Sequence, residues 1–100
     1  MYKINVEVNH AYKLDIKEFL DTQGIKNVLE VKKYAAEALQ LITITATSLS
    51  IIKTLYDFYK EMRKKKADIE INIIVNNITI NFKDMPPQEI EAKIKEIENK

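Results

Sequence analysis

The sequence predicts an α+β domain in which a three-stranded, mostly antiparallel sheet packs on one long central helix. Residues 2–8 and two segments within residues 68–82 alternate polar and apolar side chains, the period of two typical of strands that bury one face. Between them, residues 38–52 carry no charge, and no proline or glycine interrupts residues 27–65. The predicted order is β-α-α-β-β-α, with residues 1–100 forming a single domain.

The first strand is predicted at Tyr2 to Val8, where every second residue is apolar. Asp15 followed three residues later by Glu18 resembles a capping box. This pattern predicts a short helix that ends before Gly24.

The long central helix is predicted to begin at Asn27, which forms a second cap pattern with Glu30, and to run to about Lys65. Such a helix would span roughly 55 Å at about 1.5 Å per residue. A domain with one core cannot cover that length on all sides. Either a partner or a break near the threonine-rich centre is therefore required.

The C-terminal third predicts a β-hairpin followed by a helix. Residues 69–75 and 78–82 alternate around Asn76-Asn77, a pair that tolerates positive φ. Asp84 is the expected cap of the last helix, and Pro86 and Pro87 fit its first turn. Its apolar stripe comprises Ile90, Ile94 and Ile97.

The composition limits the possible functions. Sixteen basic and fifteen acidic residues give a formal charge of +1, which excludes a strong overall field for nucleic acid or anionic lipid. The absence of cysteine excludes a disulfide framework, a thiolate nucleophile and a cysteine-ligated metal. It also fits a reducing compartment, and we expect a cytoplasmic protein.

Candidate catalytic groups are few. His10 is the only histidine, and no cysteine or second histidine accompanies it as a metal ligand. Ser48 and Ser50 fall within the predicted helix, where their hydroxyls can return to backbone carbonyls. Gly24 is the only glycine, so there is no glycine-rich loop for phosphate. We expect no catalytic, cofactor-binding or metal-binding residues, and no enzyme activity.

The predicted long helix has more apolar surface than one domain can cover, which favours a protein-protein interaction module. The small side chains near its centre permit close approach, so self-association through a two-fold helix contact is the simplest arrangement. An effector or sensor protein is expected as a further partner. The predicted interface comprises Ile44, Thr47, Ser48, Ile51, Leu55 and Phe58.

Two alternatives remain open from the residues alone. A weak nucleic-acid-binding function would use a basic patch at the end of the long helix, where Tyr56, Phe58 and Tyr59 could stack on bases. A membrane-associated function would use the uncharged central segment, although it falls short of the roughly 20 apolar residues that span a bilayer. The residues of the basic patch are Lys60, Arg63, Lys64, Lys65 and Lys66.

Three features in order along the chain resemble the effector-associated constant component family of prokaryotic conflict and signalling systems. They are the helix that ends in LYDFYKEMRKKK at residues 55–66, the hairpin DIEINIIVNNITINF at residues 68–82 and the PPQEIE segment at residues 86–91. Members of the family often have a tryptophan where this chain has Phe58 and Tyr59, and a glycine where it has Asn76-Asn77. The resemblance implies a non-catalytic adaptor that couples a sensor or effector, and it supplies no catalytic residues.

Overall fold

A computed structural model describes residues 1–30 and 39–99 of the chain. Within these residues, one antiparallel sheet contains five strands in the order β2-β3-β1-β4-β5, and three α-helices accompany it. The elements are β1 (Tyr2–Asn9), a short 3-10 helix (His10–Tyr12), α1 (Lys13–Thr22), β2 (Asn27–Glu30), β3 (Leu39–Ala46), α2 (Ser50–Lys64), β4 (Ile71–Val75), β5 (Ile78–Asn81) and α3 (Pro87–Glu98).

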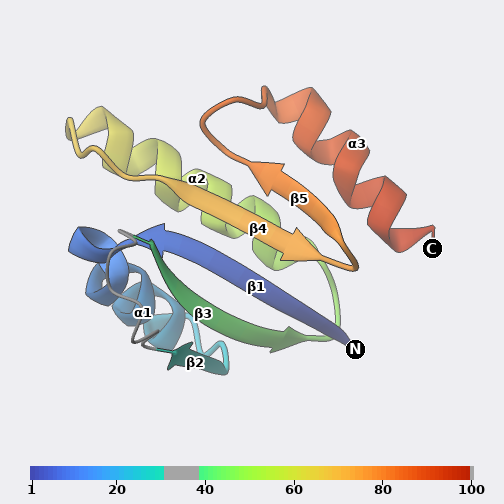
Figure 1. The fold of residues 1–100 in the computed structure, drawn as a ribbon, viewed down its shortest axis with the longest axis horizontal. Helices are drawn as coiled ribbons and strands as arrows, with labels where there is room; N and C mark the ends of the chain where they lie inside the picture. Colours follow the sequence, from blue (N-terminus) through green and yellow to red (C-terminus); the bar gives the residue numbers. More distant parts are fainter. Residues whose placement is uncertain (31–38, 100) are drawn as a thin grey trace.

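The topology of the first part of the chain is that of a ferredoxin-like unit, with the elements in the order β1-α1-β2-β3-α2-β4. In this split β-α-β arrangement β3 lies between β1 and β2, and β1 lies between β3 and β4. The chain then adds β5 at the edge of the sheet and α3 beside it (Figure 1). Because this topology carries many unrelated functions, the fold alone assigns none.

The hydrophobic core lies between the sheet and its helices. Ile4, Val6 and Val8 of β1 are completely buried, and the residues that pair with them on β3 and β4 point to the same side. Figure 1 shows α1 and α2 behind the sheet. The helices contribute buried side chains to this core: Ile16 and Leu20 from α1, Ile51, Ile52, Leu55 and Tyr59 from α2, and Ile90, Ile94 and Ile97 from α3.

The opposite side of the sheet, called the open face below, is not covered by any helix of the described residues. Its side chains alternate with the buried ones along each strand and are half-buried or exposed. Among them, Val28 of β2 is 62% exposed. The Thr43 hydroxyl donates a hydrogen bond to Oδ1 of Asn5 across this face, at 3.3 Å.

The prediction of a three-stranded sheet on one long helix was wrong. The sheet has five strands, and the longest helix among the described residues is α2, with 15 residues. Residues 27–30 and 39–46 of the predicted helix form the strands β2 and β3. Its residues 31–38 lie outside those that the structure describes, and only its last part, from Ser50, is helical as predicted.

The error arose because the segment 39–46 fits two periodicities. Its apolar residues can be placed on helix faces, yet Gln40, Ile42 and Ile44 also alternate with Leu41, Thr43 and Thr45. The β-branched isoleucines and threonines favour a strand, because their side chains pack well on a pleated surface. Pairing with β1 over eight residue pairs then holds this segment in the middle of the sheet.

The predicted helix caps were also wrong. α1 and α3 begin after Tyr12 and Pro86, neither of which makes a side-chain cap, so Asp15 and Asp84 do not cap them. Asn27 begins a strand, and its amide group donates hydrogen bonds to Asp21 and to the carbonyl of Ile25.

The first strand, the first and last helices and the hairpin lie close to their predicted positions. Asn76 and Asn77 adopt φ angles of 50° and 67° in the hairpin turn. These values fit the type I′ geometry that suits the twist of two paired strands. Among the described residues, no helix combines the length and apolar character needed to cross a bilayer.

Candidate functional site

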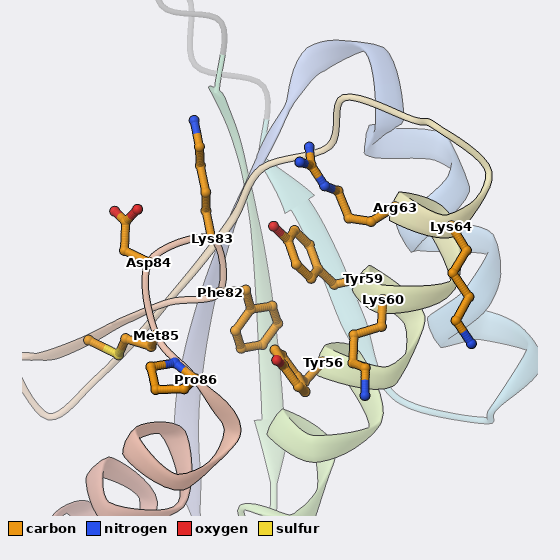
Figure 2. Close-up of a pocket in the computed structure, with 10 residues that line it drawn as sticks. All are labelled: Tyr56, Tyr59, Lys60, Arg63, Lys64, Phe82, Lys83, Asp84, Met85 and Pro86. Carbon is orange, nitrogen blue, oxygen red and sulfur yellow. The ribbon is translucent and has the colours of Figure 1, made fainter.

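A groove of about 540 Å³ lies between the C-terminal half of α2 and the loop that joins β5 to α3 (Figure 2). Its lining combines aromatic rings with positively charged side chains, which is why we consider it the main candidate site. The lining residues are Tyr56, Tyr59, Lys60, Arg63, Lys64, Phe82, Lys83, Asp84, Met85 and Pro86.

Three aromatic rings form the floor of the groove. Tyr56 and Tyr59 are three residues apart on α2, with ring centroids separated by 6.2 Å. Phe82 meets both rings, at 5.2 Å from Tyr56 and 5.7 Å from Tyr59. Because Tyr59 and Phe82 are only 7% and 2% exposed, the floor is fixed by the core, and Tyr56 is its most accessible ring.

Four cations surround this floor. Lys60, Arg63 and Lys64 follow the i, i+3 and i+4 spacing that places them on one face of α2, and Lys83 comes from the other wall. In Figure 2, Lys60 and Lys64 extend towards one end of the groove, and Arg63 and Lys83 extend towards the other. Asp84 is the single carboxylate among the described residues of the lining. Since the whole chain has a formal charge of only +1, this excess of positive charge is local.

Exposed ion pairs hold three of the cations. Arg63 lies 3.6 Å from Asp68, Lys64 lies 3.3 Å from Glu61, and Lys83 lies 3.9 Å from Glu70. Such exposed pairs contribute only about 0–1 kcal/mol each, so an incoming anion can compete with them.

Lys60 differs from the other three cations in its partner. Its ammonium group lies 5.6 Å from the centroid of the Tyr56 ring, a cation–π contact. Among the described residues no carboxylate forms an ion pair with Lys60, so this ammonium remains able to meet an anion in the groove.

Burial raises the pKa of the Tyr59 phenol above its ordinary value, and the nearby Arg63 charge opposes this shift only in part. The phenol is therefore neutral at physiological pH and does not reduce the positive charge of the groove. The described residues that line the groove include no histidine, cysteine or serine. Chemically, the groove can bind an anion next to an apolar group.

The structure separates the predicted basic patch into two parts. Lys60, Arg63 and Lys64 line the groove. Lys65 follows the last residue of α2, and Lys66 has a φ of 63°, so both lie where the helix has ended. The sequence alone did not indicate Lys83 as a groove residue, because it is the packing of Phe82 against Tyr56 and Tyr59 of α2 that brings Lys83 there. The alternation of residues 78–82, which places Phe82 on the core side of the hairpin, was the available signal.

The six residues of the predicted interface do not form one exposed helix face. Ile44 lies in β3, and Ile51 and Leu55 lie in α2; all three are buried in the core. The ring of Phe58 is half-buried, with its centroid 4.6 Å from that of Phe19 in α1. The apolar surface assigned to a partner is thus covered by the sheet and by α1.

Thr47 and Ser48, the remaining two residues of that interface, are exposed in the turn between β3 and α2. They line a shallow depression of about 370 Å³ with residues 23–26. The Ser48 hydroxyl accepts a hydrogen bond from the backbone N–H of Ser50 at 3.5 Å, a local turn contact at the start of α2.

Possible metal ligands are scattered in the part of the chain that the structure describes. It contains no group of three or more histidine, cysteine, aspartate or glutamate side chains placed to hold a metal ion. His10 is exposed in the short helix that follows β1.

Comparison of the chain with models of protein families, with curated proteins and with solved structures finds no match.

Proposed function

We propose that this protein is a non-catalytic interaction module that binds an acidic segment of a partner protein in the aromatic and basic groove. The observation that carries the proposal is the meeting of four cations over a buried aromatic floor. Aromatic, methionine and arginine side chains are enriched in protein interfaces, and this groove offers all three.

The burial of the rings favours a protein segment over a nucleic acid. Binding of single strands uses aromatic faces on which successive bases stack. In this groove Tyr59 and Phe82 are almost fully buried, which leaves the half-buried Tyr56 as the accessible ring.

The coupling of this module to an effector or sensor protein rests on the family resemblance and is part of the proposal. The cytoplasmic location rests on the absence of cysteine from the sequence and stays a prediction.

The test is a fluorescence anisotropy titration with two labelled probes, a peptide of alternating glutamate and phenylalanine and an oligothymidylate. We expect the purified protein to bind the acidic peptide and not a peptide in which lysine replaces glutamate. Replacement of both Lys60→Glu and Arg63→Glu should weaken peptide binding by at least about tenfold, because two attractive charges become repulsive.

The matched control is the double variant Lys26→Glu and Lys95→Glu. Both positions are exposed and lie away from the groove, and the change in net charge is the same. This control should keep its affinity within about twofold. Equal weakening of both variants would show nonspecific attraction and contradict the proposal. Steeply salt-dependent binding of oligothymidylate without peptide binding would favour the nucleic-acid alternative instead.

A further inference from the structure

A second surface, independent of the groove, lies on the open face of the sheet. One row of residues crosses all five strands there, as the register of the strand pairs shows, and it carries no charge. The central residue of the row is Asn5 on β1. From one edge to the other the row comprises Val28, Thr43, Asn5, Ile74 and Thr79.

The two rows that flank this uncharged row carry opposite charges on β1. Lys3 and Glu7 lie two residues before and after Asn5, so both point to the open face at equal distances from it. The described side chains that pair with them, Thr45, Leu41 and Asn72, are uncharged. The charge pattern is thus plus, zero, minus along the central strand.

From this pattern we infer that two copies of the chain associate through their open faces, about a two-fold axis that runs along the uncharged row. Such an axis keeps each strand opposite the same strand of the other copy and reverses its direction. It therefore places Lys3 of each copy opposite Glu7 of the other and makes two reciprocal ion pairs. An axis along the strands would instead place Glu7 opposite Glu7, which is repulsive.

The size of the open face allows a weak dimer of this kind. The five strands contain 4, 8, 8, 5 and 4 residues across the sheet, and at about 3.3 Å per residue and about 4.8 Å between strands they make a face of roughly 460 Å². This area is smaller than the roughly 800 Å² per partner of a standard interface, so we expect a weak dimer. Stacking would also cover the exposed Val28 and the half-buried Leu41 and Ile74.

The experiment is a charge exchange followed by light scattering coupled to size exclusion, over protein concentrations from about 1 µM to about 1 mM. The wild type should reach twice its mass of 11.7 kDa. Lys3→Glu alone and Glu7→Lys alone should each raise the dissociation constant by about tenfold or more, because each turns both ion pairs into like-charge pairs. The double variant Lys3→Glu with Glu7→Lys should restore the wild-type constant, because the pairs re-form with exchanged signs.

A matched pair of apolar positions tests the location of the contact. Val28 and Leu14 are similarly exposed, at 62% and 66%, but Leu14 lies on α1, away from the open face. Val28→Glu should weaken the dimer, and Leu14→Glu should leave it unchanged. A wild type that stays monomeric overturns the inference, as does a dimer that is insensitive to the charge changes or is not restored by the exchange. Circular dichroism of each variant confirms that the fold is kept.

Discussion

Truncation of Ile44 tests the strand β3 directly. Its side chain is 0% exposed, and its register partners are Ile4 of β1 and Asn27 of β2, so the cavity left by Ile44→Ala lies in the core beneath the centre of the sheet. Three carbon groups are removed, each worth about 0.8 kcal/mol of burial, which gives about 2.4 kcal/mol. The incompletely collapsed cavity adds to this value, and we expect a loss of about 3–4 kcal/mol in the free energy of unfolding.

The assay is urea unfolding followed by circular dichroism, with the midpoint compared at constant slope. Thr45→Ala on the open face is the control, and we expect it to cost less than about 1 kcal/mol. If residues 39–46 were helical, Ile44 would lie on a face reserved for a partner, and its truncation would barely change the stability of the monomer. A loss no larger than that of Thr45→Ala would therefore refute the strand assignment.

Three further predictions concern single groups. Because the pKa of Tyr59 is raised in the folded state, the unfolded state loses the phenolic proton at a lower pH than the folded state does. The free energy of unfolding should therefore fall as the pH rises above about 10. Urea unfolding at about pH 9 and about pH 11 should show a smaller fall for Tyr59→Phe than for the wild type. Equal falls in both proteins would contradict the pKa shift. The hydrogen bond from Asn27 lowers the pKa of Asp21 and so favours the folded state above about pH 4, an effect lost as the pH falls through the pKa. Asn27→Ala should raise that pKa in an NMR titration of the carboxyl carbon, and an unchanged titration would assign the shift to another cause. Gly24 has a φ of 72°, and a Cβ added there would meet free space. Gly24→Ala should therefore lower the free energy of unfolding only by the backbone strain, about 1 kcal/mol, in thermal or urea unfolding. No loss of stability would mean that the turn rearranges.

Local patterns were sufficient for elements whose boundaries are marked in the sequence. Asn76-Asn77 marks the hairpin turn, and Pro86 and Pro87 mark the start of the last helix. The junction between β3 and α2 lacks such a signal, because Thr47, Ser48 and Leu49 separate them without glycine or proline. Because both elements are rich in apolar residues, the sequence across the junction resembled one continuous helix. Pairing with β1, a tertiary contact, decides that residues 39–46 form a strand.

The site could be predicted only in part for a related reason. The spacing of Lys60, Arg63 and Lys64 on a helix is a local property, and all three lie on α2 and line the groove. The second wall of the groove comes from Lys83 and its neighbours, which approach α2 only because β5 extends the sheet at that edge. The burial of Phe58 against Phe19 likewise depends on how α1 packs beside α2, which no local pattern reports.

The central position of β1 also determines when the sheet can form during synthesis. A ribosome makes β1 first, but its neighbours β3 and β4 emerge only after residues 39–46 and 71–75 have been translated. Each hairpin partner, β2 for β3 and β5 for β4, is by contrast close in the sequence. β1 therefore has no neighbouring strand until residues 39–46 have been translated. Because its pairing with β3 and β4 spans more of the sequence than either hairpin does, we expect that pairing to form more slowly than the two hairpins.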